Sequence, residues 1–254
     1  MKMDNKDFAS MIRRKVGEID GTNSGINAQE RQRYASTAFG TLMRKVYLWM
    51  TLALVITGFA AYYVAHSNFI FTLYNTPALL WGLIIAELAL VIGLSAAIRK
   101  LSLPVATLMF VIYSVINGVT LSSIFLVYSI GSIAKVFLIT AGTFGAMALF
   151  GYTTKKDLSS MGKILFMALI GLIIATVVNL FVKSSGLDLI LCYGGVLIFV
   201  GLTAWDSQKI KEMCMSAEYA DEGAQKMALL GALTLYLDFI NLFLYLLRIF
   251  GRRD

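Results

Sequence analysis

Apolar runs of about twenty residues recur along the chain from Val46 onward, separated by polar segments. A helical run of this length crosses a hydrocarbon core of roughly 30 Å, because a helix rises about 1.5 Å per residue. Each run must be a helix, since an unpaired backbone polar group is costly in lipid. The runs cover residues 46–65, 78–98, 105–128, 133–151, 164–182, 187–205 and 227–250. The pattern therefore predicts an all-α membrane protein, a bundle of seven transmembrane helices.

The composition agrees with a lipid environment and excludes a soluble domain. Hydrophobic residues make up 58% of the 254 residues and charged residues 15%, whereas an average globular chain is roughly 45–50% apolar and about 25% charged. The net charge of +7 does not indicate a nucleic-acid partner, because the Lys and Arg residues lie in short clusters between the apolar runs. We expect the lipid bilayer to surround this chain, and we expect no contact with DNA or RNA.

The N-terminal segment differs from the rest of the chain. Residues 1–44 together with Lys45 hold nine of the twenty-two basic residues, and the segment has too few apolar residues to pack a core. It also lacks the apolar run of a cleavable signal peptide. We predict a polar, basic, mobile cytoplasmic tail over residues 1–44 and a seven-helix transmembrane domain over residues 45–254.

The basic residues near the helix ends predict the orientation. With the N-terminus inside, twelve Lys and Arg residues lie at cytoplasmic ends and five at outer ends, which is the excess that cytoplasmic loops carry. Three of the five outer residues, Arg248, Arg252 and Arg253, belong to the C-terminal end. A count of six helices and one re-entrant segment would place that end inside, but seven spans fit the runs better.

Two further features concern the packing of the helices. The longest polar connection between runs extends from Ser207 to Lys226, and we expect a soluble cytoplasmic hairpin there that can be partly helical. Small residues four apart, Ala141 with Gly145 and Gly142 with Ala146, let helix backbones approach closely. The fourth run is therefore expected to pack tightly on a neighbour.

Three carboxylates fall inside the apolar runs or at their ends: Glu87, Asp206 and Asp238. A charged side chain at membrane depth costs at least about 2.5–3.5 kcal/mol, so each is a candidate for function. Glu87 fits a hydrogen bond to a neighbouring helix and a role in a pore equally well. Asp238 and Asn241 are three residues apart and share a helix face. Because that face must meet protein or water, we expect the last helix at the centre of the bundle.

The spacing alone leaves the pairing of Asp206 with Asp238 open. Asp206 lies near the cytoplasmic end of its run, beside Trp205 and Lys209, and Asp238 lies about eleven residues past Met227, or roughly 16 Å along the axis. The two carboxylates meet only if the last helix starts outside the membrane or the sixth helix extends inward past Asp206. Otherwise Asp206 is a solvated charge at a helix end.

Two segments resemble the signature of a known family. Gly201 to Lys211 (GLTAWDSQKIK) and Gly231 to Arg252 (GALTLYLDFINLFLYLLRIFGR) are similar to the Bax-inhibitor-one family, also called the transmembrane BAX inhibitor motif family. The similarity continues through Gly118 to Tyr128 and Thr140 to Lys155, and it is closest to the bacterial YccA and YbhL branch. Trp205 departs from the pattern, because the family usually has Tyr before the first Asp.

The resemblance implies a multi-pass protein of a bacterial inner membrane whose last helix is central. It also implies a pair of aspartates on helices six and seven that senses pH and gates a calcium leak, and the matching residues are Asp206 and Asp238. The same two residues would hold a calcium ion in transit. The family's helix-two arginine, described as a latch on the pair, has only Arg99 as a candidate here. Glu87, Arg99 and Asn241 are thus candidates to line or gate the pore.

The expected pair has a simple physical basis. Two carboxyl groups in contact at low dielectric cannot both ionise easily, so they share a proton. The shared proton ties two helices together, whereas its loss leaves two like charges that repel or recruit a cation. We expect a two-state bundle whose balance follows pH, with protons and calcium ions as its ligands and no cofactor. The chain has no EF-hand loop.

Two other functions compete with this hypothesis. Intramembrane aspartyl proteases also place two aspartates on late helices, but their GxGD motif is missing, because the residues before Asp238 are Leu, Tyr and Leu. We therefore predict no enzymatic activity. The alternative is a non-channel regulator or binding partner of the membrane protease FtsH and the protein-export machinery, with which YccA-like proteins are associated. The basic tail would then be a handle for the protease, and the aspartates a structural contact.

Overall fold

The computed structural model describes the backbone of residues 5–252, and the side chains of residue 30 and of residues 32–252. The helices of this part of the chain are joined by short connections, and it contains no strand. Its helices are α1 (Asn5–Ala65), α2 (Phe69–Asn75), α3 (Pro77–Ala97), α4 (Leu103–Leu121), α5 (Ile124–Val127), α6 (Ile130–Thr153), α7 (Ser159–Val182), α8 (Ser185–Met215) and α9 (Glu222–Phe250).

Seven segments of the described chain are long and apolar enough to cross a membrane. They are Gln32–Ala65, Pro77–Ala97, Leu103–Val127, Ile130–Thr153, Ser159–Val182, Ser185–Met215 and Glu222–Phe250. Each overlaps one of the predicted apolar runs, and α4 and α5 together form the third. The prediction of an all-α protein with seven spans is confirmed.

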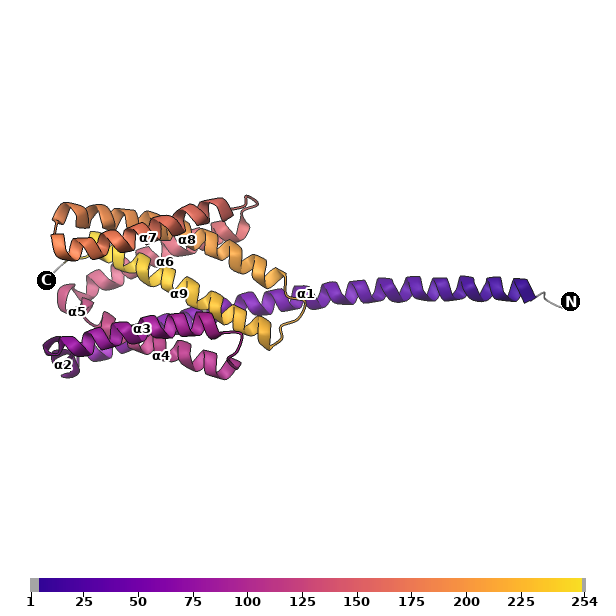
Figure 1. The fold of residues 1–254 in the computed structure, drawn as a ribbon, viewed down its shortest axis with the longest axis horizontal. Helices are drawn as coiled ribbons and strands as arrows, with labels where there is room; N and C mark the ends of the chain where they lie inside the picture. Colours follow the sequence, from indigo (N-terminus) through magenta and orange to yellow (C-terminus); the bar gives the residue numbers. More distant parts are fainter. Residues whose placement is uncertain (1–4, 253–254) are drawn as a thin grey trace.

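Helix α1 has no break at the predicted boundary between tail and membrane domain. Ala38, Leu42 and Met43 are buried, so the packed part of this helix begins before residue 45. Toward its N-terminal end, α1 leaves the bundle as a single long helix (Figure 1). Residues 1–4 of the predicted tail and Arg253 lie outside the described residues, as does the side chain of Arg31.

Helix α9 is the most enclosed helix of the bundle. It runs between α1, α3 and α4 on one side and α6, α7 and α8 on the other (Figure 1), and it packs on α1, α4, α6 and α8. In its most apolar stretch 61% of the residues are buried, against 6% in α3 and in α7. Helices α3 and α7 therefore form the periphery that faces lipid.

The connection between the last two helices is partly helical, as the prediction allowed. Helix α8 continues to Met215 and α9 begins at Glu222, so only residues 216–221 of the segment from Ser207 to Lys226 lie outside a helix. The carboxylate of Asp221 accepts a hydrogen bond from the backbone nitrogen of Ala224 at 2.8 Å, and this N-cap fixes the start of α9. Asp206 consequently lies nine residues before the end of α8, about 14 Å inward along its axis.

The glycines of α6 that indicated close packing do not provide it. A Cβ atom added at Gly142 or Gly145 would meet no atom of the described chain within 4 Å, because both face outward, so the tight packing predicted for the fourth run does not come from these two glycines. The close approach lies in α4 instead, where a Cβ at Gly118 would lie 2.5 Å from the carbonyl oxygen of Thr57 in α1. Gly151 of α6 makes a similar approach to the α8 backbone. These glycines allow α1 to pack on α4 and α6 on α8.

This difference between the glycines predicts the result of two matched substitutions. Gly118→Ala forces a methyl group against the α1 backbone, so we expect a loss of stability of about 1–3 kcal/mol, the usual cost of overpacking. Gly142→Ala places the same methyl group in open space and is expected to leave the Tm in detergent micelles unchanged. Thermal unfolding of both variants is the measurement, and equal Tm values would contradict the packing of α1 on α4.

Candidate functional site

The side chains of Asp206 on α8 and Asp238 on α9 meet inside the bundle, where each carboxyl group acts on the other. Both residues are buried, with exposed fractions of 8% and 5%. Two carboxylates this close repel each other when both are ionised. The Oδ2 atom of Asp238 has no hydrogen-bond partner among the described residues. The inward extension of α8 thus produces the pairing that the spacing left open.

The segment of α8 that carries Asp206 is tied to the α6–α7 connection. The side-chain amide of Gln208 accepts a hydrogen bond from the backbone nitrogen of Leu158 and donates one to the carbonyl oxygen of Lys156, both at 2.8 Å. The Lys211 ammonium donates to the carbonyl oxygen of Tyr152 at 2.7 Å. These bonds fix the rotation of α8 and therefore the direction of Asp206.

Trp205 and Lys209 flank the pair on the same helix. The indole ring of Trp205 covers Gly162 of α7 so closely that no Cβ atom would fit there. The Nζ atom of Lys209 lies 5.2 Å from the centre of that indole ring. The positive charge of Lys209 attracts the carboxylate of Asp206.

Arg99, the candidate latch, lies apart from the aspartate pair. It lines a separate cavity of about 430 Å³ at the end of the bundle that holds the α8–α9 connection, together with Lys226 and Met213. It does not line the cavity that contains the aspartates. In this structure the cation beside the pair is Lys209.

A cavity of about 690 Å³ contains the aspartate pair, and we call this space the dyad cavity. Helices α3, α4, α7, α8 and α9 contribute to its walls. Four of the predicted site residues line it: Glu87, Asp206, Asp238 and Asn241. Most of the other lining side chains are apolar or aromatic, and the volume falls in the range of small-molecule sites.

Glu87 both lines the dyad cavity and bonds to a neighbouring helix. Its carboxylate accepts hydrogen bonds from the hydroxyl of Thr120 at 2.6 Å and the amide of Asn117 at 3.3 Å, both on α4. The amide oxygen of Asn117 accepts a hydrogen bond from the hydroxyl of Tyr236 at 2.9 Å. That hydroxyl lies 2.7 Å from Oγ1 of Thr57. A continuous polar network therefore joins α3, α4, α9 and α1.

The polar residues of α9 form a stripe along one face. They follow one another at alternating intervals of four and three residues, which keeps them on one side of a helix. The stripe consists of Thr234, Asp238, Asn241, Tyr245 and Arg248. Its first four residues line the dyad cavity, and its last three line a second cavity of about 250 Å³. Asn241 and Tyr245 thus separate the two cavities. The spacing of the whole stripe could have been found in the sequence.

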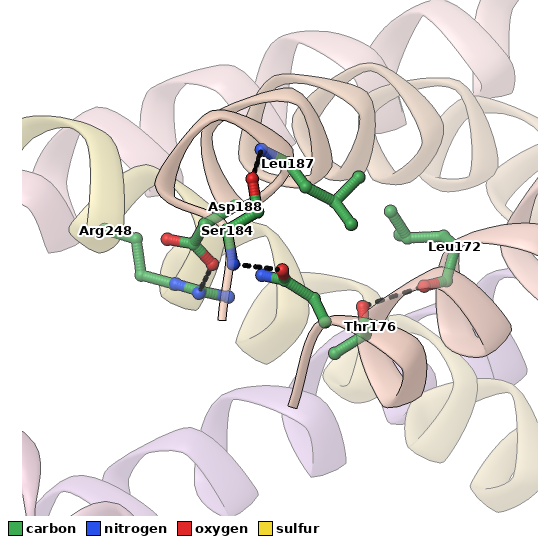
Figure 2. Close-up of polar contacts among 7 residues, drawn as sticks. Leu172, Thr176, Ser184, Leu187, Asp188 and Arg248 are labelled. Atoms are coloured by element: carbon green, nitrogen blue, oxygen red, sulfur yellow. Dashed lines mark hydrogen bonds and ion pairs between the residues drawn. The ribbon is translucent and has the colours of Figure 1, made fainter. Parts of the chain in front are cut away.

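An ion pair lies at the far end of this stripe. The guanidinium of Arg248 binds the carboxylate of Asp188 in the first turn of α8 (Figure 2). The hydroxyl of Ser184 accepts a hydrogen bond from the backbone nitrogen of Leu187 and caps the start of the same helix. The pair joins α8 and α9 at the end opposite to their short connection. The sequence did not indicate this pair, because its partners are 60 residues apart.

Seven apolar helices around a buried carboxyl pair define a membrane protein with an acidic site in its core. Residues 40–254 match the family described as Inhibitor of apoptosis-promoting Bax1, and the chain belongs to this family, as the resemblance predicted. It is 55% identical over 215 residues to the Inner membrane protein YbhL of Escherichia coli strain K12. These residues are 84% of this chain and 92% of YbhL.

Two more distant relatives cover a similar part of the chain. An uncharacterized protein of Borreliella burgdorferi is 44% identical over 212 residues, which are 83% of this chain and 91% of that protein. An uncharacterized protein of Deinococcus radiodurans is 41% identical over 214 residues, which are 84% of this chain and 91% of that protein. The likeness therefore extends over nearly all of the membrane domain.

The network around Glu87 yields a prediction for stability. Tyr236→Phe removes the hydroxyl that donates to Asn117 and leaves the buried Oδ1 atom of Asn117 without its partner, while Thr57 keeps its hydrogen bond to the carbonyl oxygen of Ser114. We expect a loss of about 1 kcal/mol, typical of one buried hydrogen bond, seen as a lower Tm in detergent. Tyr193→Phe is the matched control, since this ring is 54% exposed on α8. A Tm that falls equally in both variants would show that the network does not stabilise the fold.

Proposed function

We propose that this protein is a pH-sensitive calcium-leak channel of a bacterial inner membrane, gated by the proton shared between Asp206 and Asp238. The observation that carries the proposal is a pair of interacting carboxyl groups buried between two helices, in a cavity that holds a third carboxylate. Buried ionisable groups at membrane depth are costly to maintain and commonly mark ion or proton pathways. The proposal includes no enzymatic step and no cofactor.

The pair can exchange a proton for a cation. With one proton present, the two carboxyl groups bond and hold α8 against α9. Without it, two negative charges face each other at low dielectric, and the repulsion is relieved by separation or by a bound cation. The two aspartates supply at most four oxygens, fewer than the six to eight that calcium takes in stable sites. Such a pair suits an ion in transit better than a stored one.

The polar stripe of α9 supplies a route through the bundle. An ion in the dyad cavity would pass Asn241 and Tyr245, which separate it from the second cavity, and then reach the Asp188–Arg248 pair. The other ends of the helices, on the side of the N-terminus and the α8–α9 connection, carry the excess of Lys and Arg. This excess supports a cytoplasmic location for that side. The inner membrane as location rests on the likeness to YbhL.

Calcium flux into liposomes that contain the full chain tests the proposal. We expect the flux of the unchanged protein to differ between acidic and neutral pH by roughly 5- to 150-fold, the range of ordinary coupling free energies. Asp206→Asn and Asp238→Asn keep the size and hydrogen-bonding capacity of the side chain but cannot ionise, so each should remove most of this difference. The matched control is Asp157→Asn, an exposed carboxylate in the α6–α7 connection.

The same pH dependence in all three variants would contradict gating by the pair, and an absence of flux in the unchanged protein would contradict the leak itself.

One observation favours the alternative function, a regulator or binding partner of the FtsH protease and the protein-export machinery. Helix α1 extends beyond the bundle on the predicted cytoplasmic side (Figure 1) and offers a long segment to a partner. Protease binding that depends on this segment, without calcium flux, would support that alternative.

A further inference from the structure

The dyad cavity opens sideways between α3 and α7. Four side chains that line it are also exposed on the outer surface of the bundle: Leu88 at 58%, Phe166 at 53%, Ile173 at 56% and Val177 at 49%. The extended contacts of α3 are with α2 and α4, and those of α7 are with α8. The two peripheral helices therefore do not close against each other, and α9 is visible between them (Figure 1).

The opening lies at the depth of the hydrocarbon core. Leu88 is near the middle of α3 (Pro77–Ala97), and Ile173 is near the middle of α7 (Ser159–Val182). Both helices are apolar spans, so the opening faces the acyl chains of the bilayer. A molecule that enters here must first partition into the membrane.

The inner wall of the cavity carries an excess of negative charge. Glu87, Asp206 and Asp238 line it, and Lys209 is the only Lys or Arg among its lining residues. Even with one proton shared by the aspartates, two carboxylate charges face one ammonium. The Oδ2 atom of Asp238 has no hydrogen-bond partner among the described residues. The charge of the cavity thus favours a positively charged occupant.

Aromatic rings complete the chemistry of the site. Tyr113, Trp205 and Tyr245 line the cavity near the carboxylates. Ring faces attract ammonium groups, and combinations of aromatic rings with carboxylates recognise amines and quaternary ammonium ions. Apolar side chains such as Leu88, Phe166 and Ile173 surround the opening. The site is therefore apolar where it meets lipid and anionic with aromatic walls inside.

We propose that the dyad cavity binds a hydrophobic organic cation, an amine or quaternary ammonium ion dissolved in the bilayer, which enters between α3 and α7. Its charged end lies against the Asp206–Asp238 pair and Glu87, and its apolar end remains among the side chains at the opening. An uncharged lipid tail would fill the walls but leave the carboxylates without a counter-charge, and an anion would be repelled. Binding itself does not require the proposed calcium leak. The bound cation should also block calcium flux, and this consequence alone rests on the proposed function.

Trp205 provides a direct readout of binding. In the full chain with Trp49→Phe and Trp81→Phe, the remaining indole lines the dyad cavity. The probe is a brominated alkyltrimethylammonium ion, compared with the brominated alcohol of the same chain length, in nanodiscs. We expect saturable quenching of Trp205 by the ammonium ion, and only linear, partition-driven quenching by the alcohol.

Two pairs of variants locate the bound cation. Glu87→Gln, and the double variant Asp206→Asn with Asp238→Asn, each remove a negative charge from the cavity and should weaken the ammonium affinity by about tenfold, the effect of one charge contact of ordinary strength. Asp157→Asn, which changes an exposed carboxylate in the α6–α7 connection, should leave the affinity unchanged. Ile173→Phe narrows the opening and should slow binding, whereas Ile190→Phe, at a 69% exposed position of α8, should not.

Equal quenching by ammonium and alcohol would overturn the cation site and indicate a lipid tail only. An ammonium affinity that Glu87→Gln and the double variant of Asp206 and Asp238 both leave unchanged would overturn it as well. Ammonium-specific quenching in a protein without calcium flux would contradict the proposed leak and support the cation site. Calcium flux that depends on the aspartate pair, without ammonium-specific quenching, would support the leak and contradict the cation site.

Discussion

The contact between the carboxyl groups of Asp206 and Asp238 is the interaction on which the rest of the account depends. Two ionised carboxylates this close would repel each other inside a lipid-embedded bundle, which is why we propose that the pair shares a proton. The structure holds the contact from both sides. Gln208 fixes α8 against the α6–α7 connection, and the enclosed position of α9 keeps Asp238 away from lipid.

Helix α9 has two different faces. Its apolar face packs on α1, α4, α6 and α8 and includes Leu229, Leu235 and Leu242, which have no exposed surface. Its polar stripe, from Thr234 to Arg248, lines the two cavities. A helix that is both the core and the wall of a site cannot move without changing both. The peripheral helices α3 and α7 make fewer contacts, which leaves the cavity open toward lipid at their junction.

The spans and the family could be predicted from the sequence, because the bilayer fixes the length and polarity of each run. The bounds of the helices within the polar segment from Ser207 to Lys226 could not be predicted, because polarity marks where a chain leaves the hydrocarbon, not where its helix ends. Gly142 and Gly145 misled for a related reason, since small residues permit close packing only where another helix is present. The Asp188–Arg248 pair joins distant residues and required the structure. The stripe of α9, in contrast, is visible in its spacing.

Infrared spectroscopy of the protonated carboxyl groups at neutral pH tests the shared proton most directly. The account predicts a carbonyl stretch from a protonated carboxyl group in the unchanged protein, and predicts that Asp206→Asn and Asp238→Asn each alter it, because one proton bonds both side chains. Asp157→Asn should leave the band as it is. A spectrum without the band, or a band that only one of the two substitutions changes, would contradict a proton shared between α8 and α9.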